Sequence, residues 1–82
     1  MSITLHQFER IDGLMSSLLR MGPFETCADP RGCVRTENRL FDACVDAMGL
    51  DYANDFASGL ECAAHIVMRG LSSSTFVREC AA

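Results

Sequence analysis

The feature that most constrains this chain is a helical repeat near its start. Apolar residues recur there at spacings of three and four, which place side chains on one face of an α-helix: Leu5, Phe8, Ile11, Leu14, Met15, Leu18 and Leu19. Thr4 and Gln7 stand three residues apart, the spacing of a capping box at a helix start. Gly22 and Pro23 are typical of a helix end. The repeat predicts an amphipathic helix over residues 5–21.

Two further helices are predicted from similar signals. Thr36 can cap a helix over residues 36–48, which Gly49 ends. Asp51 can cap another over residues 52–69, with Gly70 after it. The expected apolar face of the second helix holds Leu40, Phe41, Cys44, Val45 and Met48, and that of the third holds Tyr52, Phe56, Leu60, Ala63, Ala64 and Val67. Cys62 and His65 are expected on the opposite, more polar side of the third helix.

The run of hydroxyl residues 72–75 predicts a cap for a short last helix over residues 74–80. No helical period crosses residues 22–35, where Asp29–Pro30 and Arg31–Gly32 read as turn-forming pairs. No alternating strand pattern competes with the helices. We therefore expect an all-α fold: a small three- to four-helix bundle in one domain, residues 1–82, with a long loop between its first two helices.

Composition bears on function through an excess of apolar residues. They make up 49% of only 82 residues, more than a small domain can bury, so we expect an apolar patch that meets a protein partner or a second copy. The net charge of −4 disfavours direct binding to nucleic acid or to anionic membranes. The lack of lysine indicates a GC-rich gene, typical of a bacterial or phage source.

The expected location is the cytoplasm. No run approaches the roughly 18 apolar residues of a membrane span, and the first residues do not form a signal peptide. The five cysteines cannot all pair within one chain, and in a reducing compartment we expect them as thiols.

Four residues form a candidate metal site: Cys27, Cys33, Cys62 and His65. Cys62 and His65 lie three apart on a predicted helix, and Cys27 and Cys33 lie in the predicted loop. Three thiolates and one imidazole suit tetrahedral zinc, which would be structural; we expect no other cofactor. The alternative is that these cysteines are ordinary buried residues, as we expect for Cys44 and Cys80.

Charged residues offer candidate partner contacts. Arg31, Arg35 and Arg39 form the only basic cluster, and four aspartates, Asp42, Asp46, Asp51 and Asp55, follow it. The arginines could bind an acidic partner, or they could pair with nearby carboxylates such as Glu25, Asp29 and Asp42. The aspartates could face a basic partner. Residues 52–69 carry too little basic charge for a DNA-recognition helix.

We do not expect an enzyme, because the chain lacks a nucleophile elbow, a phosphate loop and a dinucleotide glycine pattern. The leading hypothesis is a small acidic protein-interaction module, self-associating, of the phage- or plasmid-type accessory class that inhibits or redirects a larger host protein. One alternative is a helical domain stapled by structural zinc. Another is an acidic mimic of nucleic acid that binds a basic protein.

Overall fold

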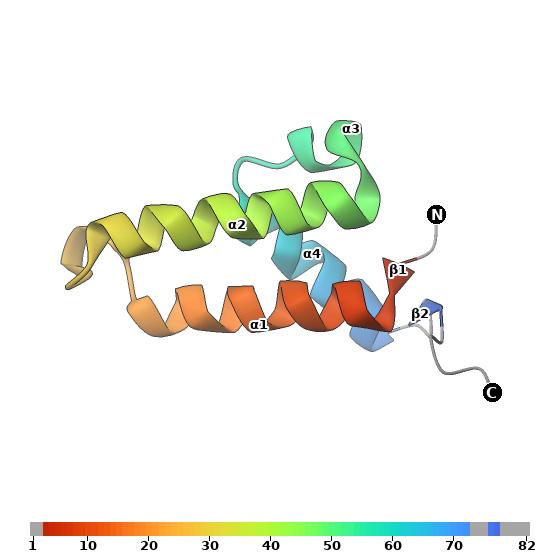
Figure 1. The fold of residues 1–82 in the computed structure, drawn as a ribbon, viewed down its shortest axis with the longest axis horizontal. Helices are drawn as coiled ribbons and strands as arrows, with labels where there is room; N and C mark the ends of the chain where they lie inside the picture. Colours follow the sequence, from red (N-terminus) through yellow and green to blue (C-terminus); the bar gives the residue numbers. More distant parts are fainter. Residues whose placement is uncertain (1–2, 73–75, 78–82) are drawn as a thin grey trace.

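The computed structural model describes the backbone of residues 3–72 and 76–77 and the side chains of residues 3–70 (Figure 1). In chain order the elements are β1 (Ile3–Thr4), α1 (Leu5–Met21), a short 3₁₀ helix (Phe24–Thr26), α2 (Pro30–Met48), α3 (Leu50–Asn54), α4 (Gly59–Ser72) and β2 (Phe76–Val77). Apart from the two-residue strands, the regular structure is helical, so the predicted all-α class is confirmed. No helix among these residues is long and apolar enough to cross a membrane.

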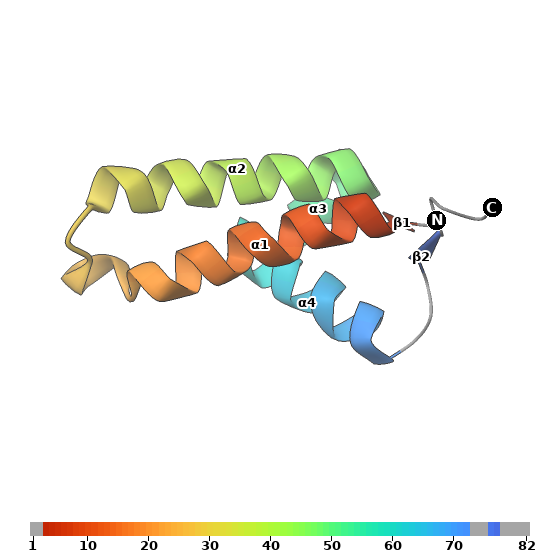
Figure 2. The same cartoon turned by 60° about the horizontal axis from the view of Figure 1, so that its bottom comes forward.

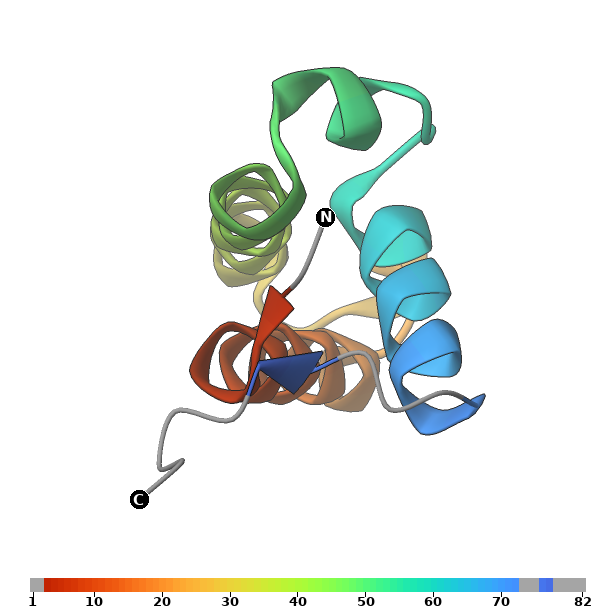
Figure 3. The same cartoon turned by 90° about the vertical axis from the view of Figure 1, so that its right-hand side faces the viewer.

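The helices α1 and α2 form an antiparallel hairpin, and α4 crosses it on one side (Figures 1 and 2). In both views α4 begins near the middle of the hairpin and runs toward the start of α1. Seen along the hairpin, α1, α2 and α4 surround a common centre, and α3 caps one side (Figure 3). Only one half of the hairpin is therefore covered by a third helix.

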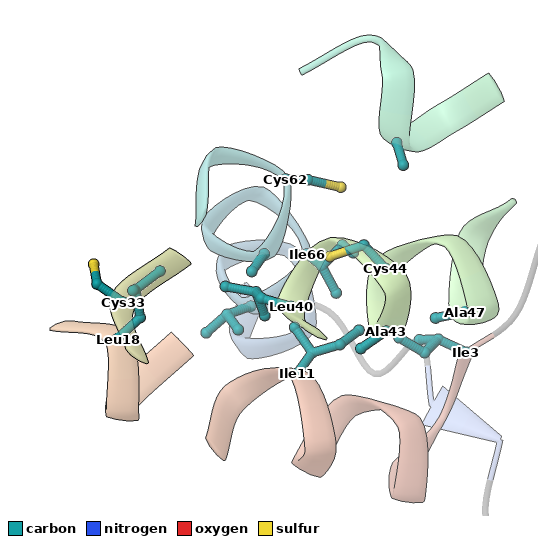
Figure 4. Close-up of a cluster of buried hydrophobic side chains, with 13 residues drawn as sticks. Ile3, Ile11, Leu18, Cys33, Leu40, Ala43, Cys44, Ala47, Cys62 and Ile66 are labelled. Carbon is teal, nitrogen blue, oxygen red and sulfur yellow. The ribbon is translucent and has the colours of Figure 1, made fainter. Parts of the chain in front are cut away.

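The core is made mainly of small and aliphatic side chains from these three helices (Figure 4). Its largest fully buried members are Ile11 from α1, Leu40 and Cys44 from α2, and Cys62 from α4. Alanines at 43, 47 and 63 are buried too, and their small side chains let the helices approach closely. Cys33 and Leu18 lie together at one end of this cluster (Figure 4).

The first helix matches its predicted bounds, Leu5–Met21. The capping box is present: the Gln7 N–H donates to Thr4 Oγ1 at 3.0 Å, and the Thr4 N–H donates to Gln7 Oε1 at 3.0 Å. Gly22 follows the helix at a φ of 81°, a region that glycine adopts readily. Both ends of α1 are set by residues within or next to the helix.

The long loop predicted over residues 22–35 is wrong. Helix α2 begins at Pro30, six residues before the predicted start, and Thr36 lies inside it. Asp29 is the N-cap, and its Oδ1 accepts a 3.0 Å hydrogen bond from the Gly32 N–H. Proline at the first helical position needs no hydrogen-bond partner for its nitrogen and has a φ suited to a helix. The Asp29–Pro30 pair is thus a helix start rather than a turn.

The single helix predicted over residues 52–69 is also wrong. The chain forms α3, breaks over residues 55–58, and starts again as α4 at Gly59. This break changes the phase of the second part, so Cys62 is fully buried rather than on the polar side. His65 is exposed, as expected.

The last predicted helix, residues 74–80, is contradicted where the structure describes it. Residues 76–77 form β2, which pairs in parallel with β1 through Ile3–Phe76 and Thr4–Val77. The other residues of that range lie outside the described part of the chain. The sequence predicted no strand, and this prediction was wrong for these two short segments.

Candidate functional site

An apolar groove lies in the half of the hairpin that α4 leaves uncovered. It encloses a hollow of about 570 Å³. Its walls come from the end of α1, the linker, the start of α2 and the start of α4, through Leu18, Leu19, Gly22, Pro23, Phe24, Cys33, Val34, Glu37, Ser58 and Leu60. Eight of these ten residues lack a polar functional group other than a thiol, so the groove suits an apolar occupant.

Three large apolar side chains of the groove are widely exposed. Leu19 is 59% exposed, Phe24 54% and Val34 47%. They come from α1, from the 3₁₀ helix and from α2, so the linker between the two long helices brings them together. Single exposed apolar residues are common on protein surfaces, but a group of them beside an apolar hollow is typical of an interaction site.

The groove ends where α4 begins, and Glu37 fixes that position. Its Oε1 accepts a hydrogen bond from the Gly59 N–H, and its Oε2 accepts one from the Leu60 N–H at 3.2 Å. Directly before α4, Ser58 Oγ accepts a 3.1 Å hydrogen bond from the Glu61 N–H. A side chain of α2 therefore caps the first turn of α4, whose N–H groups have no partner within their own helix.

Gly59 allows the backbones of α2 and α4 to approach at this point. A Cβ atom there would lie 2.8 Å from the Phe41 nitrogen and 3.0 Å from the Glu37 carbonyl oxygen. Both neighbours are backbone atoms of α2, so they cannot move aside as a flexible side chain could. Residue 59 thus marks the border between the covered and the open half of the hairpin.

Two thiols lie in contact at the edge of the groove. The side chains of Cys27, in the linker, and Cys33, in the first turns of α2, are hydrogen-bonded to each other. Cys27 is half-buried and Cys33 is buried beside the hollow. Burial raises the pKa of the Cys33 thiol, and the neighbouring Cys27 raises it further.

A second pair of thiols joins α2 to α4 inside the core. Cys44 and Cys62 are both fully buried, and their side chains are hydrogen-bonded to each other. Burial is the main cause that raises the pKa of Cys44 to about 12, with a further contribution from Cys62. Burial also raises the pKa of Cys62, while its hydrogen bond with Cys44 lowers it.

The four predicted zinc ligands are not brought together. Cys27 and Cys33 pair at the groove, Cys62 pairs with Cys44 in the core, and His65 lies on the outside of α4. Within residues 3–70, no three His, Cys, Asp or Glu side chains converge as metal ligands. A structural zinc site needs four ligands, so the proposed set has no geometry that supports it.

His65 instead belongs to a small aromatic group between α3 and α4. Its Nδ1 and the Tyr52 hydroxyl are hydrogen-bonded at 2.7 Å. The Phe56 ring lies 5.4 Å from that of Tyr52 and 5.1 Å from that of His65, measured between centroids. The contact holds the two helices together across the break at residues 55–58.

The predicted charged contacts lie on the outside of α2. Arg31, Arg35, Arg39, Asp42 and Asp46 are all exposed. None of the three arginines forms an ion pair with a carboxylate of the described residues, so the alternative that they pair locally is not observed. Asp46 Oδ2 accepts a 3.4 Å hydrogen bond from Gln7 Nε2, and Asp42 has no such bond within the described chain.

The remaining two aspartates are separated from this face. Asp51 lies in α3 and Asp55 directly after it, and both are exposed. The sequence suggested one acidic run from residue 42 to residue 55. The structure divides this run between two elements at Gly49, whose φ of 92° turns the chain.

Sequence reasoning missed the groove. It placed Leu19 on the buried face of the first helix and gave Phe24 and Val34 no role, because it treated residues 22–35 as a loop. The Asp29–Pro30 pair was the available signal, since it fits an N-cap followed by a first-turn proline. If this pair is interpreted as a helix start, the predicted helix includes Val34.

Comparison of the chain with models of known families, with curated proteins and with solved structures finds no match. The groove, the two thiol pairs and the charged face of α2 therefore have to be interpreted from their own chemistry.

Proposed function

We propose that this chain is a non-catalytic protein-interaction module whose groove receives the apolar face of a helix from a larger protein. The observation that carries the proposal is the hollow of about 570 Å³ beside three widely exposed apolar side chains, Leu19, Phe24 and Val34. Covering such side chains is favourable at about 25 cal/mol for each Å² of apolar surface removed from water. An amphipathic helix laid into a groove is a common way to do this.

The other half of the hairpin indicates which kind of element fits. There α4 lies against α1 and α2 and completes a layer of three helices. That layer stops at Gly59, although α1 and α2 continue beyond it (Figures 1 and 2). A helix from a partner would continue the layer over the open half, with its apolar side chains in the hollow.

The polar groups of the groove support binding rather than catalysis. Both Glu37 oxygens accept hydrogen bonds from backbone N–H groups of α4, and Ser58 caps the same helix. These two side chains are engaged in holding α4. The thiol of Cys33 has a raised pKa, which disfavours the thiolate that a nucleophile requires.

The sequence hypothesis gives this module a context. A short acidic chain rich in apolar residues is typical of phage- or plasmid-type accessory proteins that inhibit or redirect a larger host protein. In the present proposal the exposed helix of such a host protein would occupy the groove, and the accessory protein would act by covering it.

The test compares two variants with equal exposure at the substituted residue. Phe24 and Leu50 are each 54% exposed, but only Phe24 lines the groove. We expect affinity capture from cells of the source organism to yield a partner with the wild type and with Leu50→Glu. Recovery with Phe24→Glu should fall at least about tenfold, because a carboxylate would have to be buried against apolar surface.

Hydrogen exchange on the captured complex gives an independent readout. The amides of residues 18–24 and 33–37 should gain protection on binding, and those of α3 should not. The proposal would be overturned if every captured protein were retained by Phe24→Glu. Equal loss with both variants would also count against it, since that pattern would indicate general damage.

A further inference from the structure

The outer face of α2 is polar and exposed, and α1 borders it along one edge, where Gln7 contacts Asp46. Six exposed residues lie on it: Arg31, Arg35, Asn38, Arg39, Asp42 and Asp46. At about 100° of rotation per residue, all six fall within an arc of about 100°. In Figure 3, where α2 is seen end-on, α1 lies below it and α3 and α4 lie toward its right, so its left side has no neighbouring helix.

The charges on this face are sorted by sign along the helix. The arginines occupy its first half and the aspartates its second half. The first turn contains no acidic residue and the last turn no basic one. This order opposes the helix dipole, which favours negative charge at the N-terminus and positive charge at the C-terminus. The arrangement therefore does not serve the stability of α2 itself.

The same order fits a second copy of the helix that runs in the opposite direction. The point midway between Asn38 and Arg39 is equally distant from Arg31 and Asp46, and also from Arg35 and Asp42. A two-fold axis through that point places Arg31 opposite Asp46 and Arg35 opposite Asp42 of the other copy, and it places Arg39 opposite the neutral Asn38. It also brings the basic first half of one helix beside the negative C-terminal end of the other.

We propose that two copies of this chain associate through antiparallel α2 helices, with Arg31 opposite Asp46 of the second copy and Arg35 opposite Asp42. An interface around a two-fold axis must be complementary to itself. The outer face of α2 meets this requirement, because Arg31 and Arg35 exchange places with the two aspartates under the rotation. The arginines have no ion-pair partner within the described chain, and Asp46 has its Oδ1 available beside the bond that Gln7 makes to Oδ2. The proposal does not rest on the groove.

The association is weak and sensitive to salt. Each exposed ion pair contributes little to the free energy of association. The two-fold axis generates only two Arg31–Asp46 pairs and two Arg35–Asp42 pairs. The aliphatic stems of the arginines add contact with the facing helix. We expect a dissociation constant in the range from about 0.1 to 1 mM, rising at least about tenfold between about 0.02 M and 0.5 M sodium chloride.

Charge reversal tests the direction and register of the pair. Arg31→Asp with Arg35→Asp gives an acidic variant, and Asp42→Arg with Asp46→Arg gives a basic variant. Each variant alone should be monomeric by sedimentation equilibrium, because every facing pair then has like charges. Mixed in equal amounts they should associate with about the affinity of the wild type, since all pairs are then opposite.

The fourfold variant that combines both reversals should again form a homodimer. Asp51→Arg with Asp55→Arg is the matched control, because both residues are exposed but lie outside α2; it should leave the association unchanged. Circular dichroism confirms that each variant is folded, and Asp42→Arg alone replaces the basic variant if the loss of the Gln7 contact unfolds it. A monomeric wild type at about 1 mM in low salt, or variants that fail to associate when mixed, would overturn the proposal.

Discussion

The two halves of the α1–α2 hairpin are made of the same two helices, but only one half is covered by a third. In the covered half, Cys44 of α2 is buried together with Cys62 and Ile66 of α4. In the open half, Leu19 and Val34 remain about half exposed although they stand on the same helices. The difference shows that the covered half holds the largest fully buried side chains, whereas the open half leaves apolar side chains exposed beside the groove.

The two thiol pairs show the same contrast in chemistry. Cys44 and Cys62 are fully buried, so the solvent cannot stabilise a thiolate there, and the pKa of Cys44 is about 12. Cys33 lines the open groove, and its partner Cys27 is only half-buried. Identical residue pairs thus stand on the two sides of the border that Gly59 marks.

The largest expected effect comes from a core substitution in the covered half. Leu40→Ala should lower the free energy of unfolding by about 2–5 kcal/mol, because Leu40 is fully buried and its loss leaves a cavity. Val34→Ala, in the open half, should change it by no more than about 0.5 kcal/mol. Urea unfolding followed by circular dichroism measures both. Similar losses at the two positions would remove the distinction between the halves.

Alkaline pH should destabilise the covered half through Cys44. Its pKa is about 12 in the folded chain against 9.0 ordinarily, so above pH 9 the unfolded chain releases the proton first. A pKa raised in the folded state means that stability is complete below pH 9 and is lost as pH rises toward 12. The free energy of unfolding should fall by up to about 1.4 kcal/mol per pH unit in this window.

This dependence is measured from the urea midpoints of unfolding at several pH values between about 8 and 11. The Cys44→Ala variant should lose most of it, with the part due to Cys62 remaining. The Cys27→Ala variant should keep it. If Cys44→Ala and the wild type fell in parallel, the buried thiol pair would not be the source.

A substitution at the border between the halves should have an intermediate effect. Gly59→Ala should destabilise the fold by about 1–3 kcal/mol, because the new Cβ would meet backbone atoms of α2. Gly13→Ala is the control: nothing lies within 4 Å of a Cβ there. In the middle of α1 that change should stabilise by about 0.5–1 kcal/mol. Thermal unfolding compares the two, and a tolerated alanine at residue 59 would contradict the close approach.

The smallest effect is expected at the far end of the open half. Asp29→Ala should cost about 1 kcal/mol, since it removes the side-chain oxygen that caps α2. Thr36→Ala should cost less, because Thr36 lies within α2 and caps no helix. Stability curves in urea would separate the two positions. A greater loss at Thr36 would favour a helix that starts there.

Local signals in the sequence were sufficient for α1. Its capping box, its apolar repeat and its final glycine all lie within or next to the helix, so no distant residue was needed to place its ends. The class of fold followed from such repeats. The start of α2 is also encoded locally, but Asp29–Pro30 can either begin a helix or form a turn, and the pair by itself does not distinguish the two.

The start of α4 could be predicted only in part. Ser58 and Glu61 have the spacing of a capping pair, and Ser58 does cap the helix. The other contribution comes from Glu37, more than twenty residues earlier in the chain, through its hydrogen bonds to the Gly59 and Leu60 N–H groups. A contact of this kind depends on how α2 and α4 pack, which periodicity within one segment does not show.

The candidate site was predicted least well. The charged residues of α2 were identified, but their unpaired state and shared face depend on the early start of that helix. The groove depends on where α4 stops relative to a hairpin formed elsewhere in the chain. The predicted zinc set failed for a similar reason, since the break before Gly59 turned Cys62 toward Cys44 in the core.

The short pairing of β1 with β2 has a mechanical consequence. Because the strands are parallel, the N-terminal end of β1 and the C-terminal end of β2 lie at opposite ends of the pair. A force that stretches the chain from outside residues 3 and 77 therefore slides the two strands along each other and loads their hydrogen bonds together. This small ladder is the first part of the described fold to bear tension, and it must shear before the pull reaches the helices.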